Sequence, residues 1–164
     1  MDLPQRKPNR LPRFDYNTPG AYFITICVNE RKCIFWEGVG ATIGRPQKPP
    51  LSAYGTMVET AIKNIPEHYP AISVDHYAVM PNHIHLLLQI HTDTDGRPMV
   101  APTISTVIQQ LKGVITKRIG QPVWQKLFHD HIIRNEQDYL KIWEYIDNNP
   151  AKWEEDCFYE EDFP

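Results

Sequence analysis

Residues 83–91 restrict the fold of this chain more than any other segment. The stretch reads HIHLLLQIH, and successive side chains of a β-strand point to opposite faces of a sheet. One face is entirely apolar, since it carries Ile84, Leu86, Leu88 and Ile90. The chain must therefore contain a sheet with at least one face packed against a hydrophobic core.

Other segments supply the remainder of an α+β sandwich. Strands are predicted over 21–28, 74–80 and 128–134, and helices over 54–65, 103–119 and from 136 to Pro150. The order strand, helix, strand, strand, helix, strand, helix is the split βαβ pattern of a ferredoxin-like or RRM-like fold. We expect an antiparallel sheet with helices on one face and an additional C-terminal helix. No internal repeat or linker is found, so residues 1–164 are expected to form one domain.

Charge is distributed unevenly, although the net charge is only −3. Residues 1–150 contain 16 Lys and Arg against 14 Asp and Glu, whereas residues 151–164 contain one Lys against six acids. We expect an acidic tail over 151–164 and a basic, proline-rich arm over 1–20. Arg10 and Arg13 in this arm are either contacts to a phosphate backbone or solvated surface residues.

Cysteine content and hydropathy indicate a cytoplasmic protein. Cys27, Cys33 and Cys157 are odd in number and form no CxxC pair, which favours reduced thiols over a disulfide framework or a zinc site. No segment approaches the roughly 20 apolar residues of a membrane span. The N-terminus lacks the apolar core of a secretory signal. We expect no membrane association.

His83 and His85 share the second face of the predicted strand over 83–91. A separation of two residues places their Cα atoms about 6.6 Å apart, so that both imidazoles can bind one divalent cation. Two solvated strand histidines explain the spacing equally well. A second pair with the same spacing, His129 and His131, is also present.

Tyr145 and Asn149 are four residues apart and therefore share one face of the last predicted helix. A phenol beside a carboxamide can provide a nucleophile and an oxygen ligand for the same metal. Simple packing is the competing interpretation, because most half-exposed helical tyrosines only pack.

Together these segments resemble the single-tyrosine HUH transposases, and in particular the REP-associated tyrosine transposases. The resemblance rests on residues 77–85 (YAVMPNHIH), 133–135 (IRN) and 139–150, which end in YIDNNP. Residues 22–25 (YFIT) are also similar to the start of the family. The likeness covers most of residues 14–153.

The resemblance implies a metal-dependent endonuclease and strand transferase that acts on single-stranded DNA at hairpin-forming palindromic repeats. Tyr145, on the C-terminal helix, would be the nucleophile and form a 5′-phosphotyrosine intermediate. His83 and His85 would bind Mg²⁺ or Mn²⁺, and Asn149 occupies the place of the third ligand. Insertion-sequence relatives have glutamine at that place. The family also implies a homodimer.

Several cations are candidates for contacts to DNA. Lys112, Lys117 and Arg118 lie around the exposed side of the helix over 103–119, where a solvated helix face is an equally good interpretation. Arg134 and His131 are candidates for contacts to a phosphate or to the transition state. For His131, a buried and hydrogen-bonded side chain is the preferred alternative.

Three other functions are alternatives to that of a transposase. A histidine-triad nucleotide hydrolase is excluded because position 87 is leucine and not a third histidine. A non-catalytic nucleic-acid-binding module of the same fold would need stacking aromatic side chains where His83 and His85 lie. A domesticated copy that cuts DNA without transposing would have the same sequence features as the enzyme of a mobile element.

Overall fold

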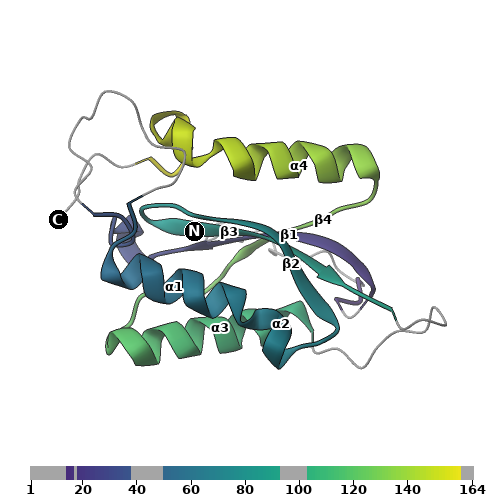
Figure 1. Ribbon diagram of the computed structural model, residues 1–164, viewed down its shortest axis with the longest axis horizontal. Coiled ribbons are helices and arrows are strands. Elements are labelled where there is room, and N and C mark those ends of the chain that lie inside the picture. The colour runs from purple at the N-terminus through teal and green to yellow at the C-terminus, as the bar shows by residue number, and fades with distance from the viewer. Residues whose placement is uncertain (1–13, 17, 38–49, 93–102, 160–164) are drawn as a thin grey trace, which may run out of the picture.

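A single four-stranded antiparallel sheet forms the centre of the computed structural model, which describes residues 14–16, 18–37, 50–92 and 103–159 (Figure 1). Its strands are β1 (Gly20–Cys27), β2 (Ile72–Val79), β3 (His83–Ile90) and β4 (His129–Ile132). They lie in the order β2-β3-β1-β4, and each neighbouring pair is antiparallel. The α+β sandwich predicted from the sequence is confirmed.

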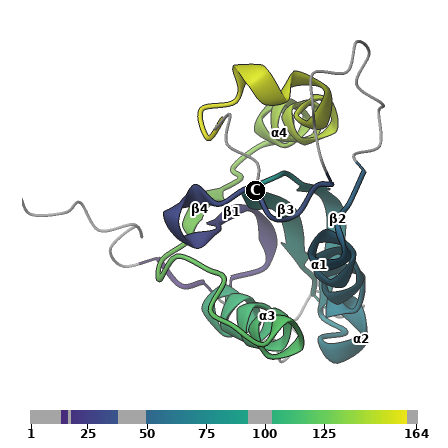
Figure 2. The ribbon, with the colours of Figure 1, turned by 90° about the vertical axis from the view of Figure 1, so that its left-hand side faces the viewer.

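Helices cover both faces of this sheet (Figure 2). On one face lie α1 (Ala53–Lys63), the short α2 (Ile65–His68) and α3 (Ile104–Ile119). On the other face lies α4 (Glu136–Asn148), which is followed by a 3₁₀ helix, η2 (Pro150–Glu155). A further 3₁₀ turn, η1 (Asn29–Arg31), follows β1.

The face of the sheet toward α1 and α3 forms the main core. The predicted apolar side chains of β3 are at most 2% exposed, and similar side chains from β1, α1 and α3 belong to the same buried cluster. Members of this cluster include Ile24, Ile26, Val58, Ile62, Ile84, Leu86, Leu88, Val107, Ile108 and Ile115. Removing these side chains from water supplies the main driving force for this layer.

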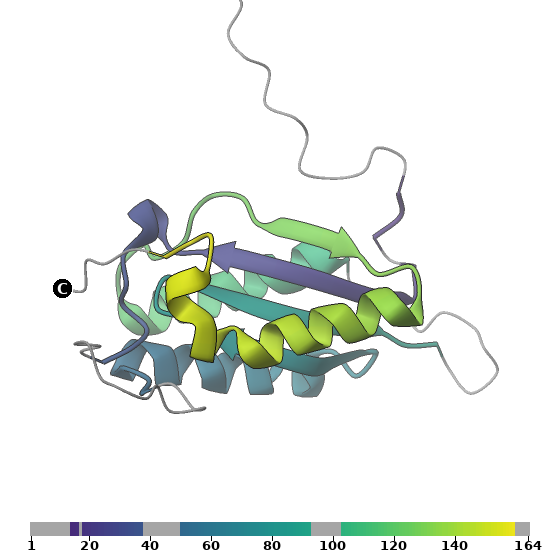
Figure 3. The ribbon, with the colours of Figure 1, turned by 90° about the horizontal axis from the view of Figure 1, so that it is seen from above.

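The second face of the sheet is covered as well, by α4, which lies over the strands (Figure 3). The ring of Trp143 stacks on His76 of β2 at a centroid distance of 4.5 Å, and the hydroxyl of Tyr139 donates to Asp75 over 2.7 Å. Because α4 lies here, Leu87 on the second face of β3 is fully buried. His83 and His85 lie on the same face of β3 as Leu87 and are also buried. The alternative of two solvated strand histidines is therefore wrong.

The acidic segment predicted over 151–164 is partly packed against the sheet, as far as the structure describes it. Trp153 of η2 is fully buried, and its ring lies 6.4 Å from that of Trp36 and 6.0 Å from that of His83. Asp156 is also buried. Residues 150–159 are thus part of the packed structure, because their apolar side chains cover the end of the sheet despite the acidic composition.

The start of α1 depends on a glycine. Ser52 caps the helix, since its Oγ accepts a hydrogen bond from the amide of Gly55 over 3.1 Å and donates to the carbonyl of Ile34 over 2.6 Å. This brings the Phe35 carbonyl so close that a Cβ atom on Gly55 would lie 2.1 Å from its oxygen. By contrast, a Cβ atom on Gly113 of α3 would meet no atom within 4 Å.

We expect Gly55→Ala to lower the free energy of unfolding by about 1–3 kcal/mol, because overpacking against backbone outweighs the helix propensity of alanine. Gly113→Ala is the matched control and should raise the same quantity by up to about 1 kcal/mol. Urea denaturation of both variants measures the difference. Equal stability of the two variants would show that the packing of α1 against the Phe35 carbonyl is not tight.

Candidate active site

His83 and His85 lie side by side on β3, on the face that α4 covers. Their side chains are 0% and 1% exposed, and their Nε2 atoms are 3.0 Å apart. The rings meet edge to face at a centroid distance of 4.6 Å. Both imidazoles are thus held in one buried position with the same ring nitrogen directed at the same point.

Hydrogen bonds to the other ring nitrogens fix this arrangement. The Asn82 amide nitrogen donates to the carbonyls of Phe158 and Arg31 over 2.8 and 3.3 Å, so its Oδ1 must face His83 Nδ1, which lies 2.8 Å away. His83 Nδ1 is therefore the donor, and its Nε2 carries a lone pair. His85 Nδ1 is hydrogen-bonded to Thr25 Oγ1 of the neighbouring strand over 2.8 Å.

Asp156 supplies a third ligand atom at this point. Its side chain is fully buried, and one carboxylate oxygen lies 3.7 Å from His83 Nε2. Ligand atoms of His83, His85 and Asp156 all lie within 4.8 Å of one another. Among the residues that the structure describes, this is the one group of three such side chains arranged closely enough to hold a metal ion.

Asn149 completes the cluster from the end of α4. It is 4% exposed, and its Nδ2 donates to an Asp156 carboxylate oxygen over 2.5 Å. The Asn149 side chain also interacts with the His85 imidazole and raises the pKa of that ring, but its buried Oδ1 accepts no hydrogen bond of good geometry within the described part of the chain. A buried amide oxygen without a donor is costly, and a bound cation would satisfy it.

The donor set fits a divalent cation. Burial, and then the Arg31 guanidinium, lowers the pKa of His83 to about 3, and burial followed by the influence of His83 lowers the pKa of His85 well below its usual range. Both rings are therefore neutral and able to act as ligands at neutral pH. Two nitrogens at right angles on a metal, each about 2.1 Å away, would be about 3.0 Å apart, which matches the observed separation of the Nε2 atoms.

Tyr145 of α4 lies next to these ligands. Its ring centroid is 5.3 Å from that of His85 and 6.1 Å from that of Phe23, and its side chain is 42% exposed. Burial, and then the Asp156 carboxylate and Cys157, raises the pKa of Tyr145 to about 12, so the phenol is protonated at neutral pH. A cation held by the ligand cluster would favour the phenolate instead.

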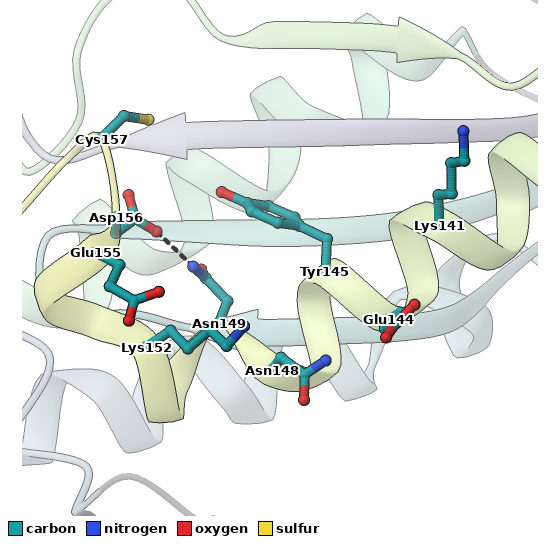
Figure 4. Close-up of a pocket in the computed structure, with 9 residues that line it drawn as sticks. All are labelled: Lys141, Glu144, Tyr145, Asn148, Asn149, Lys152, Glu155, Asp156 and Cys157. Atoms are coloured by element: carbon teal, nitrogen blue, oxygen red, sulfur yellow. Dashed lines mark hydrogen bonds between the residues drawn. The ribbon is translucent and has the colours of Figure 1, made fainter.

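An open pocket of about 500 Å³ lies beside the phenol (Figure 4). We call it the α4 pocket; its lining residues are Lys141, Glu144, Tyr145, Asn148, Asn149, Lys152, Glu155, Asp156 and Cys157. The Tyr145 hydroxyl points toward the Asp156 side of this space (Figure 4). The exposed nucleophile and the buried ligand cluster are thus adjacent, and a substrate can approach the phenol from solvent.

Two relatives from Haemophilus influenzae strain Rd are similar to most of the chain. One is named only as an uncharacterized protein; it is 32% identical over 173 residues, which span 94% of this chain and 93% of the relative. The other is named "Putative REP-associated tyrosine transposase" and is 28% identical over 148 residues, which span 85% of this chain and 75% of that protein. These similarities agree with the resemblance of the sequence motifs to the REP-associated tyrosine transposases.

A solved structure has the same fold as this chain. It is a REP-associated tyrosine transposase bound to a REP hairpin, with a TM-score of 0.63 and 24% sequence identity, and the match covers 88% of this chain and 74% of that chain. No family model matches the chain. None of the helices in the described ranges is long and apolar enough to cross a membrane.

The structure brings the predicted site residues of this chain together. Tyr145, His83, His85 and Asn149 come from two elements that are far apart in the sequence, and they meet on one face of the sheet. The second histidine pair does not form such a site. The His131 side chain is 52% exposed, so the expectation that it is buried is wrong. Its Nε2 atom lies 2.7 Å from Asp138 Oδ2, which agrees with the expected hydrogen bond.

The predicted DNA contacts lie elsewhere. Lys112 is on α3, on the opposite side of the sheet from α4, and its Nζ donates to the carbonyls of Gln125 and Lys126 over 2.8 and 3.4 Å. Lys117 and Arg118 are exposed in the last turn of α3, and Arg134 is exposed between β4 and α4. Arg10 and Arg13 are outside the described residues. The role of all six cations in DNA binding stays a prediction.

Sequence reasoning missed three residues of the site: Asp156, Asn82 and Thr25. Thr25 lies directly opposite His85 in the antiparallel register of β1 and β3, and a correct strand pairing would have identified it. Asn82 precedes His83 in the turn after Pro81. Asp156 carries no signal of its own in the sequence, because it follows Glu154 and Glu155 in a segment of acidic composition.

Proposed function

We propose that this chain is a transposase that cuts and rejoins single-stranded DNA, with Tyr145 as the nucleophile and a divalent cation bound by His83, His85 and Asp156. One observation carries the proposal: an accessible phenol lies beside a buried cluster of neutral imidazoles and a carboxylate. A phosphodiester repels an attacking phenolate unless positive charge is nearby. The bound cation would supply that charge at the phosphate oxygen.

Cleavage of the DNA strand needs only the phenol of Tyr145 and the phosphodiester as reactants. Tyr145 Oη forms a bond to phosphorus while the bond from phosphorus to the 3′ oxygen breaks, and the proton lost from the phenol is matched by one gained at that 3′ oxygen. A 5′-phosphotyrosine and a free 3′-hydroxyl result. The ester energy is retained in the phosphotyrosine, so the reverse attack by a 3′-hydroxyl rejoins DNA without a nucleotide cofactor.

The chain's own residues prepare this step. Asn82 and Thr25 orient the imidazoles of His83 and His85, and Asn149 orients the Asp156 carboxylate through its amide hydrogen bond. Two imidazoles with a carboxylate suit Mn²⁺ at least as well as Mg²⁺, which prefers oxygen ligands. Asn149 Oδ1, predicted from the sequence as the third ligand, is an additional oxygen for the cation.

The proposed substrate is a hairpin formed by a palindromic repeat. The solved relative is bound to a REP hairpin, which supports this class of DNA for the present chain. The homodimer and the cytoplasmic location stay predictions from the resemblance and the cysteine content.

A non-catalytic module of the RRM type is disfavoured, because such modules stack bases on an open sheet face and α4 covers that face here.

With Mn²⁺, the wild-type chain should form a covalent adduct on a single-stranded hairpin oligonucleotide, whereas Tyr145→Phe should form none and still bind the DNA. Denaturing gel electrophoresis of labelled oligonucleotide detects the adduct. Tyr69→Phe, which removes a phenol near α2 on the opposite side of the sheet, is the control and should react normally. A normal adduct yield from Tyr145→Phe would remove this residue from the mechanism.

Metal binding should depend on the buried cluster. We expect His83→Ala, His85→Ala and Asp156→Asn each to weaken Mn²⁺ binding by at least about 100-fold, and Asn149→Ala by about 10-fold through loss of the hydrogen bond to Asp156. Titration calorimetry measures these affinities, and circular dichroism checks that each variant is folded. His68→Ala, an exposed histidine of α2, is the control. Unchanged affinity in the three ligand variants would place the ion elsewhere.

A further inference from the structure

The α4 pocket has one lysine at each end and the nucleophile between them. Lys141 precedes Tyr145 by one helical turn, about 6 Å along the axis, and Lys152 follows α4 in η2 (Figure 4). Both side chains are exposed, and within the part of the chain that the structure describes neither ammonium group forms an ion pair. The two charges are therefore available to a ligand that reaches the phenol.

The pocket also contains negative charge. Glu144, Glu155 and Asp156 line it together with the two lysines, so the formal charge of the lining is −1 at neutral pH. A DNA strand brings further negative charge and would be repelled by this lining. A divalent cation at the ligand cluster would change the formal charge to +1, which attracts a phosphate backbone.

The cations that the sequence predicts as DNA contacts are poorly placed to attract a DNA strand to Tyr145. Lys112 already donates to two loop carbonyls, and Arg118 lines a separate small pocket between α1, α2 and α3. The sheet lies between these residues and Tyr145 (Figure 2). A strand bound along α3 would thus have to pass around the edge of the sheet to present a phosphate to the phenol.

We infer that the DNA strand to be cut lies along α4, with backbone phosphates at Lys141 and at Lys152 on either side of Tyr145, and that it enters this pocket only when the cation is bound. The inference rests on the proposed function and adds to it the path of the strand and the order of binding. Lys141 and Lys152 are positioning residues, because they hold the flanking phosphates and not the reacting one.

The test measures binding of a labelled unpaired oligothymidylate by fluorescence anisotropy, in a Tyr145→Phe background so that no adduct forms. Lys141→Gln and Lys152→Gln should each weaken binding in Mn²⁺ by about 5-fold and reduce the dependence of log affinity on log salt by about 0.7, the value for one lost phosphate contact on a single strand. Replacing Mn²⁺ by EDTA should abolish most binding. Lys63→Gln on α1, whose side chain is 60% exposed, is the matched control and should have no effect.

Two further results would overturn the inference while leaving the proposed function intact. One is unchanged binding by Lys141→Gln and Lys152→Gln, above all if Lys117→Gln and Arg118→Gln weaken it, since the strand would then lie along α3. The other is equal affinity in Mn²⁺ and in EDTA. If the parent protein binds no single-stranded DNA even in Mn²⁺, the proposed function itself fails.

Discussion

Two buried imidazoles that meet at their Nε2 atoms, 3.0 Å apart, are the feature on which the rest of the site depends. This contact is a hydrogen bond, and because His83 Nε2 carries a lone pair, His85 Nε2 is the donor. A cation that both nitrogens bind would take the place of this proton. Asn82 fixes the proton of His83 on the opposite ring nitrogen, and burial lowers the pKa of both rings. The histidines are therefore prepared to bind a cation and are poorly suited to hold a second proton.

The sheet separates two tasks between its faces. Side chains at alternate positions of β3 form the main core with α1 and α3, and this layer provides stability without polar groups. The intervening positions hold the histidines, which would be exposed if α4 and η2 did not cover them. Trp153 and Ile146 anchor that cover, so the segments that carry Tyr145 and Asp156 are positioned by ordinary hydrophobic packing.

Much of this arrangement could be predicted from the sequence, because it follows from local patterns. The alternation in β3, the apolar stripe of α3 and the stop at Pro150 set the elements, and they led to the correct sandwich. His83, His85 and Tyr145 could be selected because their spacing and their resemblance to a known family coincide. The structure then shows that these residues are adjacent.

The remaining features depend on contacts between distant segments, which leave no local pattern. Asp156 resembles the acids beside it and differs only in being buried over β3. The acidic composition of residues 151–164 gives no sign that Trp153 brings part of this segment into the packed structure. Lys112 is likewise a cation of the kind that contacts DNA, but its ammonium group already donates to a loop carbonyl.

A crystal of the wild-type chain grown with Mn²⁺ and measured near the manganese absorption edge would test the central claim most directly. We expect one strong anomalous peak within coordination distance of both Nε2 atoms and of an Asp156 oxygen, on the side of the cluster that faces Tyr145. A peak at another group of residues, or none at a saturating Mn²⁺ concentration, would contradict the assignment of this cluster as the metal centre of this protein.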